Sequence, residues 1–537
     1  MIKCNSFKKI LDEDSHYIES LHYELNGWLT ISNLAGANPS LFTSHDVEWI
    51  NENLQKASIK HKFAIESVLN SYKSIPKNQP VQFYFDTGYV GWYDDTKNVD
   101  AFDPCPPHIG FNSSYASMYP NGGQTKNITI VITEDCPLAC TYCYQANKNP
   151  TYMTKSRIHE IVDLLFHEDM NNSKLINPQI SEALIIEFIG GEPLMSIDMM
   201  NEFMEYFLCT AVKLKHRWAI KYMISVSSNG VLYNSKNVQK FIETYKGRLS
   251  LNITIDGNKD LHDSCRRFKD GSPSYDIVER SVKQHLRINP YMSTKLTLSP
   301  DNIMYTFNAI KNLFTEVGVR VVFANCVFED GWTYDHAKIL YAQMKQLADW
   351  LIDNNLTNTY YCSLFSEFIG SPLPPSDNAN YCGGSGAMLS FTADGGIQPC
   401  LRYCAFNLNN KQPELRIGSI QEGLLSTDEH CNVYNELSSI TRRSQSTDEC
   451  FNCPIASGCA WCSAHNYEQF GTANKRATAI CPMHKARTLA NYYYYNKLYR
   501  SRGSQDRSVV YMPIGMALDI IDKNEFAYLE SMSRYDK

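Results

Sequence analysis

Six strand-like segments alternate with helix-like segments between residues 127 and 323, and this alternation restricts the chain to an α/β architecture. The strand-like segments are rich in β-branched residues and lie at Asn127–Thr133, Ala183–Phe188, Tyr222–Val226, Ser250–Ile255, Thr294–Leu298 and Val319–Phe323. Helical apolar spacing begins between them at Ser156, Met199, Asn237, Tyr275 and Met304. We therefore expect six β–α units around a parallel sheet, with the chemistry at the carboxyl ends of the strands.

The first strand-like segment runs directly into three cysteines, Cys136, Cys140 and Cys143, in CxxxCxxC spacing. A cubane [4Fe–4S] cluster normally takes four cysteine ligands, so three would leave one iron open to another ligand. A zinc site and three buried structural cysteines are the alternatives.

This motif resembles the signature of the radical S-adenosylmethionine (SAM) enzymes, with Tyr142 at the aromatic position. The resemblance implies a partial (β/α)6 barrel in which Cys136, Cys140 and Cys143 hold the catalytic cluster. In that family the open iron chelates the amino and carboxylate groups of SAM. One electron from the cluster then releases a 5′-deoxyadenosyl radical, which abstracts a hydrogen atom from the substrate.

The second strand-like segment ends in Gly190, Gly191, Glu192 and Pro193. Glycines allow close approach of the main chain to a ligand, and the carbonyl groups and Glu192 can accept hydrogen bonds. The four residues match the GGEP motif of the family, which receives the amino group of SAM. A glycine turn capped by the glutamate is the alternative reading.

Two further motifs follow later strands. Ser227 and Asn229 lie after the third strand, where the family contacts the ribose and carboxylate of SAM, although a simple Asn-Gly turn explains Asn229 nearly as well. Arg266 belongs to an HDxxR pattern after the fourth strand. Its guanidinium suits the SAM carboxylate because it makes paired hydrogen bonds, and an ordinary surface ion pair is the alternative.

A second field of cysteines begins at Cys382 and resembles the SPASM extension, which holds two auxiliary [4Fe–4S] clusters. By this resemblance one cluster uses Cys382, Cys400 and Cys462, and the other uses Cys450, Cys453, Cys459 and Cys481. Only two residues precede Cys462 where the usual pattern has three, which weakens its placement. Cys404 could complete the first auxiliary cluster, which otherwise keeps an open iron. A zinc ribbon is the alternative for such paired spacing.

Residues within this second field of cysteines differ between enzymes of the family that have different activities. Anaerobic sulfatase-maturing enzymes carry a cysteine where this chain has Met388 and an aspartate where it has Leu401. The chain looks more like the peptide maturases that form thioether crosslinks in Cys-repeat ribosomal precursor peptides. A carbon–carbon crosslink or another peptide modification would leave every motif unchanged. A non-enzymatic iron–sulfur or zinc protein is the alternative from another class.

The expected domains follow from these motifs. We expect an N-terminal α+β module at residues 1–102, a linker at 103–125, the barrel at 126–360, the SPASM domain at 361–490 and a tail at 491–537. The first module should contain a hairpin at Tyr23–Ile31, a helix from Ser44 to about Ser71 and a strand at Val81–Phe85. It resembles a leader-peptide recognition element, and a structural cap is the equal alternative. Cys105 in the linker is expected to be a free thiol.

Composition restricts the partners and the compartment. The net charge is −7 and no long basic run occurs, so nothing favours nucleic acid or an anionic membrane as a partner. Without a targeting or membrane-spanning segment, the protein is expected to be cytoplasmic. Clustered spacing of its 18 cysteines favours metal binding in a reducing compartment over disulfides. The expected cofactors are SAM and three [4Fe–4S] clusters, and the expected partners are a precursor peptide and a flavodoxin or ferredoxin.

Overall fold

The computed structural model describes residues 125–533, apart from gaps at 146–147, 168–174, 179–180, 182, 215, 220–221, 247, 291, 330, 386–387, 410 and 505–511. It also describes the backbone of three short antiparallel strands, β1 (Val81–Tyr84), β2 (Val90–Tyr93) and β3 (Asp103–Pro104). The strand predicted at Val81 is therefore confirmed. The hairpin, the helix and Cys105 lie outside the described residues.

The strand β3 lies where a linker was expected. It pairs with Gly91 and Trp92 of β2, so the small sheet extends two residues past the predicted end of the N-terminal module. The turn-forming composition of this segment suggested a linker, but main-chain pairing with a neighbouring strand decides the outcome. Pro104 is compatible with this strand because β3 is at the edge of its sheet.

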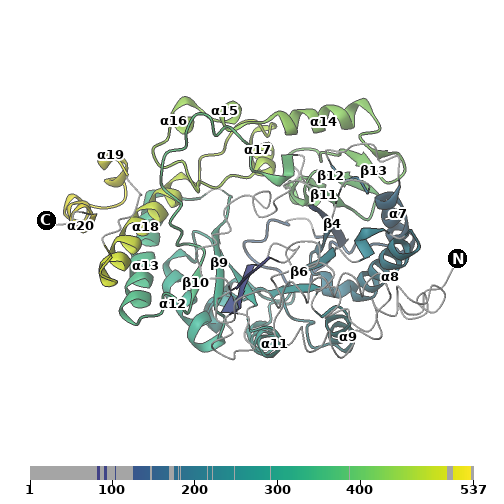
Figure 1. The fold of residues 1–537 in the computed structure, drawn as a ribbon, viewed down its shortest axis with the longest axis horizontal. Helices are drawn as coiled ribbons and strands as arrows, with labels where there is room; N and C mark the ends of the chain where they lie inside the picture. Colours follow the sequence, from purple (N-terminus) through teal and green to yellow (C-terminus); the bar gives the residue numbers. More distant parts are fainter. Residues whose placement is uncertain are drawn as a thin grey trace.

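All six predicted strands of the barrel are confirmed. They are β4 (Thr125–Thr133), β5 (Ala183–Gly190), β6 (Tyr222–Ser228), β7 (Leu249–Ile253), β8 (Ser293–Leu298) and β9 (Val321–Cys326). The helices are α7 (Lys155–Phe166), α8 (Ile197–Lys213), α9 (Lys236–Thr244), α10 (Lys259–Cys265), α11 (Tyr275–Ile288), α12 (Thr306–Asn312) and α13 (Tyr334–Asp353). Figure 1 shows them arranged around the strands.

The six strands do not share one hydrogen-bonded sheet, in contrast to the prediction. The strands β4 to β7 pair in parallel, whereas β8 and β9 form a second parallel sheet with β10 (Tyr361–Cys362). Side chains bridge the seam instead: the Thr294 hydroxyl donates to Ile253 O (2.8 Å) and accepts from Ile255 N (3.2 Å). A buried hydroxyl thus satisfies main-chain groups that a ladder would otherwise pair.

The cysteine-rich segment is joined to the barrel through the sheet itself. Its strand β11 (Met388–Phe391) pairs in parallel with β4, and β12 (Gly396–Gln398), β13 (Gly418–Ser419) and β14 (Gly423–Leu424) continue the sheet. The order is β14-β13-β12-β11-β4-β5-β6-β7. The segment also contains α14 (Asp428–Ser439), α15 (Arg442–Gln445), α16 (Asp448–Phe451) and α17 (Ser463–Phe470). These helices lie together beyond β11 in Figure 1.

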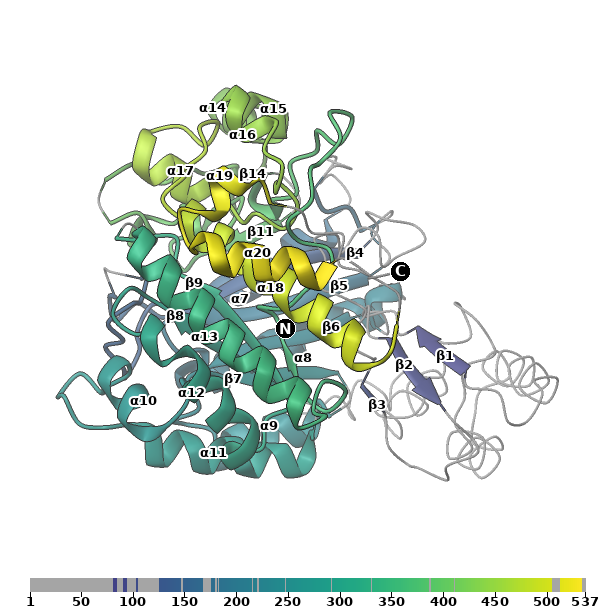
Figure 2. The ribbon, with the colours of Figure 1, turned by 90° about the vertical axis from the view of Figure 1, so that its left-hand side faces the viewer.

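The last long helix, α18 (Cys481–Ser501), packs against α13, as Figures 1 and 2 both show. Lys497 pairs with Asp349 at 2.7 Å across this contact. Tyr492, Tyr493 and Tyr494 are buried on α18. The tail ends in α19 (Ile514–Ala517) and α20 (Lys523–Ser533), and its described residues form no strand.

Within the described part of the chain, no helix combines the length and the apolar composition that are needed to cross a membrane.

Candidate active site

The loop that carries Cys136, Cys140 and Cys143 leaves the carboxyl end of β4 and is held by the segment that follows α10. Ala139 N donates to Arg267 O (2.8 Å), and Thr141 N donates to Cys265 O (2.9 Å). In return, Lys269 N donates to Pro137 O (3.1 Å). Main-chain bonds to a different β–α unit therefore determine the shape of this loop.

The three cysteines are buried or half-buried. Cys136 is buried, and Cys140 and Cys143 are half-buried. Burial raises the pKa of Cys136 to about 11 and also raises that of Cys140, on which Cys143 acts as a further negative charge. Thiolates are the ligand form of cysteine, so metal binding here would release protons. Three adjacent thiols on one loop fit a thiolate-bound iron–sulfur cluster with one iron left open.

Two glycines bring the end of β5 against this loop. Gly191 N donates to Thr133 O (2.9 Å), and Glu192 N donates to Asp135 O (2.8 Å). A Cβ atom on Gly191 would lie 2.2 Å from Asp135 O, which no side chain can accept. The Gly190 carbonyl accepts from Gln145 Nε2 (2.8 Å), so the β5 end is bonded on both sides of the cysteine motif.

The Glu192 carboxylate ties the β5 end to the β6 end. It accepts hydrogen bonds from Ser228 Oγ (2.8 Å), Asn229 N (2.7 Å) and Leu194 N (3.1 Å). Burial raises the pKa of Glu192, and these hydrogen bonds act against that rise. Pro193 then begins a short 3-10 helix, Pro193–Ser196. The carboxylate is thus engaged within the protein, which agrees with the capping alternative and leaves direct contact with SAM as a prediction.

The two residues predicted after β6 lie in different surroundings. Ser227 is exposed. Asn229 is buried and its Nδ2 lies 3.6 Å from Cys136 Sγ, which it contacts as a weak donor. Sequence reasoning missed Ser228, although strand alternation places it on the side opposite Ser227.

A buried polar cluster of Tyr142, Asp256 and Arg266 lies beside the cysteine loop. The Tyr142 hydroxyl donates to the Asp256 carboxylate and accepts from Arg266 Nη1 (2.9 Å). Among the described residues, Arg266 Nε and Asp256 Oδ1 have no hydrogen-bond partner although both are buried. An unused donor and an unused acceptor can therefore serve a polar ligand here. Sequence reasoning missed Asp256, whose position directly after β7 was the available signal.

His262 of the HDxxR pattern supports this cluster from behind. Ser274 Oγ donates to Arg266 O (2.6 Å), so His262 Nε2 donates to Ser274 Oγ (3.0 Å) and His262 Nδ1 accepts from Asp256 N (3.2 Å). Both ring nitrogens are satisfied only in the neutral imidazole. Burial, with the charge of Arg266, lowers the pKa of His262 to about 3.

The cysteines of the second field lie in two neighbourhoods. The thiols of Cys382, Cys400 and Cys462 act on one another electrostatically, and so do those of Cys450, Cys453, Cys459 and Cys481. No three His, Cys, Asp or Glu side chains in the described ranges are gathered around one point that could hold a single metal ion. A cubane cluster spreads its ligands over several irons, so its thiols need not converge on one point.

Cys404 lies near one member of the first of these neighbourhoods. It is buried in an apolar cluster with Val131, Leu401 and Phe406, against which Cys400 also packs. The neighbouring charge that acts most strongly on its thiol is that of Cys400, and neither Cys382 nor Cys462 is among the charges that act on it. Its role as a fourth ligand stays a prediction.

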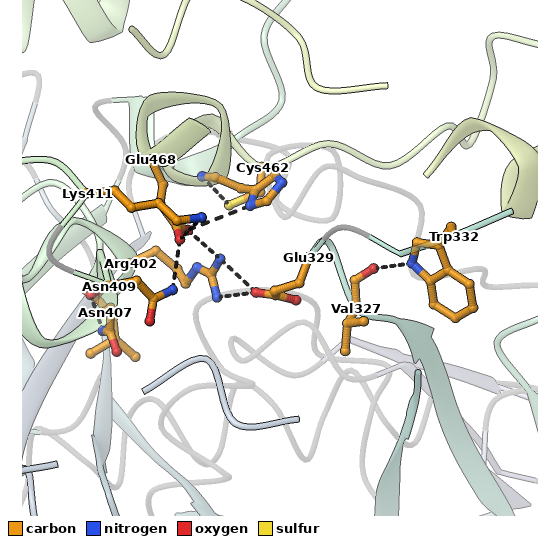
Figure 3. Close-up of polar contacts among 11 residues, drawn as sticks. Val327, Glu329, Trp332, Arg402, Asn407, Asn409, Lys411, Cys462 and Glu468 are labelled. Carbon is orange, nitrogen blue, oxygen red and sulfur yellow. Dashed lines mark hydrogen bonds and ion pairs between the residues drawn. The ribbon is translucent and has the colours of Figure 1, made fainter. Parts of the chain in front are cut away.

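Arg402 connects the second cysteine field with the barrel, as Figure 3 shows. Its guanidinium contacts Glu329 in the loop after β9 (3.2 Å) and Glu468 on α17 (3.8 Å). It also lies over the ring of Tyr144, 4.6 Å from the ring centroid, directly after Cys143. The loop that carries Glu329 is closed by Trp332 Nε1, which donates to Val327 O (2.9 Å). One half-buried arginine thus contacts the cysteine loop, the barrel mouth and α17.

Comparisons with known proteins agree with this geometry. No protein-family model matches the chain. The radical SAM cyclopropyl synthase TigE of Paramaledivibacter caminithermalis is 23% identical over 382 residues, which cover 68% of this chain and 73% of TigE. The chain is therefore similar to a radical SAM enzyme over about two thirds of its length.

Other radical SAM relatives are more distant or match a shorter part. The serine-type anaerobic sulfatase-maturating enzyme of Bacteroides thetaiotaomicron is 23% identical over 240 residues, 44% of this chain and 55% of that enzyme. The solved structure of anSMEcpe with bound AdoMet has a TM-score of 0.50 at 16% identity and covers 74% of this chain and 98% of that chain. This structural likeness supports the α/β fold of the barrel and the cysteine-rich segment.

The neutral state of His262 predicts a pH-dependent stability. In the unfolded chain the histidine binds a proton below about pH 6.5, whereas in the folded chain it stays neutral down to about pH 3, so stability falls as the pH falls through this window. His262→Asn should be less stable than the wild type at pH 7. That difference should shrink by about 2 kcal/mol at pH 5, as measured by denaturant unfolding. Parallel stability curves for the two proteins between pH 7 and 5 would contradict this role.

Proposed function

We propose that the protein is a radical SAM peptide maturase that installs thioether crosslinks in a ribosomally made precursor peptide. The observation that carries this proposal is the Arg402 contact, which joins the loop after β9 to the segment carrying the second cysteine field and lies on Tyr144, next to Cys143. A substrate at the barrel mouth would therefore meet both thiol neighbourhoods. The names of the relatives support a peptide or protein substrate, since two of them mature sulfatases.

In this proposal Cys136, Cys140 and Cys143 hold the catalytic cluster, which together with SAM supplies a 5′-deoxyadenosyl radical. The protein's own part is to place SAM. The Gly190–Pro193 turn presents its main chain, and Ser227 and Asn229 offer polar groups from the β6 end. Arg266 presents its unused Nε donor to the SAM carboxylate, while Tyr142 and Asp256 hold the guanidinium in place.

The auxiliary clusters would be held by Cys382, Cys400 and Cys462 and by Cys450, Cys453, Cys459 and Cys481. The first set has three cysteines, so it would leave a coordination position for a substrate thiolate. Metal ligation favours the thiolate by lowering the effective pKa of cysteine. Holding the thiolate and the carbon radical side by side makes crosslinking a matter of proximity. A flavodoxin or ferredoxin would deliver the electron.

A carbon–carbon product is the second candidate, because TigE, which matches 68% of the chain, is named a cyclopropyl synthase. Sulfatase maturation is less well supported. Met388, at the position of the additional cysteine, packs beside Gly383, and Leu401, at the position of the aspartate, is buried in an apolar cluster. Neither side chain can ligate a thiolate-type cluster or act as a base.

The SAM site predicts a selective effect of Arg266→Ala. Loss of a charged hydrogen bond should weaken SAM binding by about 1.5–3 kcal/mol, as measured by calorimetry on the reconstituted protein, while the iron content is unchanged. Arg267→Ala is the matched control, because Arg267 is exposed and its side chain donates to Gly271 O. Equal affinities in the two variants would return Arg266 to a structural role.

Glu192 can be tested in the same assay. If its carboxylate acts by holding the β5 and β6 ends together, Ser228→Ala and Glu192→Ala should both weaken SAM binding, with the larger loss for Glu192→Ala. If the carboxylate instead binds the amino group of SAM directly, Ser228→Ala should leave the affinity unchanged. Unchanged affinity in Glu192→Ala would rule out both roles.

The cluster assignment predicts the iron content. Anaerobically reconstituted protein should hold about twelve irons per chain in three four-iron clusters. Replacement of Cys136, Cys140 and Cys143 together by Ala should remove about four of them. Cys209→Ala is the control, because Cys209 is a buried core residue of α8. Loss of all iron in the triple variant, or zinc in place of iron in the native protein, would contradict the assignment.

The thioether proposal predicts the product. Reduced enzyme with SAM should convert a Cys-containing precursor peptide to a product lighter by two hydrogens per crosslink. One hydrogen atom leaves in 5′-deoxyadenosine, the thiol proton goes to solvent, and the remaining electron passes to an auxiliary cluster. The number of free thiols should fall by about one per crosslink. It should not recover after treatment with a reducing agent, as measured by alkylation and mass spectrometry. If all cysteines alkylate after reduction despite the mass loss, the product is a carbon–carbon or desaturated one.

A further inference from the structure

Tyr403 is fully buried, and its hydroxyl has no hydrogen-bond partner among the residues that the structure describes. It ends the short helix Leu401–Tyr403, in which its main-chain N–H donates to Cys400 O (2.9 Å). Buried tyrosine hydroxyls usually find an acceptor, because an unpaired one loses its bond to water without replacement. An orphaned donor at this depth therefore indicates an acceptor other than the residues that the structure describes.

The surroundings of Tyr403 show which acceptor this is. Its ring belongs to a buried cluster with Leu437 and Ala464, against which Cys400 and Cys462 pack. A Cβ atom on Gly384 would lie 3.6 Å from both Cys400 Sγ and Tyr403 Cε2, so the phenol edge and this sulfur face the same small space. The charges that act most strongly on the phenol are those of Cys382, Cys462 and Cys400.

Neighbouring residues do not share this arrangement. Tyr467 lies in the same buried cluster with its ring centroid 6.0 Å from that of Tyr403, but its hydroxyl donates to Pro413 O (3.0 Å). Cys404, the next residue in sequence, packs into a different apolar cluster. Among these, only Tyr403 combines an unpartnered buried hydroxyl with a ring that packs beside Cys400 and Cys462.

We propose that the Tyr403 hydroxyl donates a hydrogen bond to a sulfur atom of the cluster held by Cys382, Cys400 and Cys462, and thereby raises the reduction potential of that cluster. This rests on the proposed function only in assigning a cluster to these three cysteines. A hydrogen bond to sulfur stabilises the more negative, reduced state more than the oxidised state. Tyr403 is thus a tuning residue, which acts through the cluster and touches no substrate.

The test compares Tyr403→Phe with Tyr467→Phe in the reconstituted full-length protein. Both variants lose one oxygen from a buried ring, so both should fold and keep their iron. Tyr403→Phe should shift the midpoint potential of one auxiliary cluster to a more negative value in a redox titration followed by electron paramagnetic resonance. A tenfold smaller equilibrium constant for reduction corresponds to about 59 mV for a one-electron couple. Tyr467→Phe should leave all potentials unchanged.

A second readout detects the hydrogen bond directly. After exchange into D2O, the reduced wild-type cluster should show hyperfine couplings to exchangeable deuterons, among them that of the His465 N–H, which donates to Cys462 Sγ (3.4 Å). Tyr403→Phe should remove one further coupling, which Tyr467→Phe retains. Full iron with an unchanged potential and coupling in Tyr403→Phe would overturn this inference and leave the proposed function intact. Wild-type protein that binds only about four irons would overturn the auxiliary cluster assignment, and this inference with it.

Discussion

The carboxylate of Glu192 is the point on which the site geometry depends. It fastens the end of β5 to the end of β6 through Ser228 and the Asn229 main chain, while the glycines before it press β5 against the residues that precede Cys136. Three consecutive strand ends are thereby joined without any ligand. A buried anion is costly unless its hydrogen bonds are satisfied, and three donors meet that condition here. The cysteine loop can therefore be preorganised before it binds a cofactor.

A second polar cluster completes the frame on the other side of the loop. Tyr142 lies between Asp256 and Arg266, and His262 holds the main chain of Asp256 in its neutral form. These groups come from the loop after β4, the end of β7 and the region of α10. Because partners in a buried network depend on one another, loss of one would disturb the others. The unused Arg266 Nε and Asp256 Oδ1 mark where this network is open to a ligand.

The cysteine-rich segment is fixed to the barrel in three ways. The strand β11 extends the sheet at β4, α18 packs along α13, and Arg402 links Glu468 to Glu329 and Tyr144. A parallel main-chain ladder is a stiff connection compared with a flexible linker. Any chemistry that needs groups from both parts would therefore take place at a set distance. Strand pairing crosses the division expected at residue 360, because β10 pairs with β9 and β11 pairs with β4.

The sequence by itself determined the six strands, the cysteine loop at the end of the first, and the glycine turn at the end of the second, because alternation, β-branched runs and glycine requirements are local properties of the chain. It also indicated the radical SAM family. It did not reveal Ser228, Asp256 or Arg402 as parts of the site, since each acts through partners far away in sequence. The break between β7 and β8 and the pairing of β11 with β4 were likewise decided only in the tertiary structure. Strand pairing depends on which edges meet in space, and no local pattern in the chain carries that information.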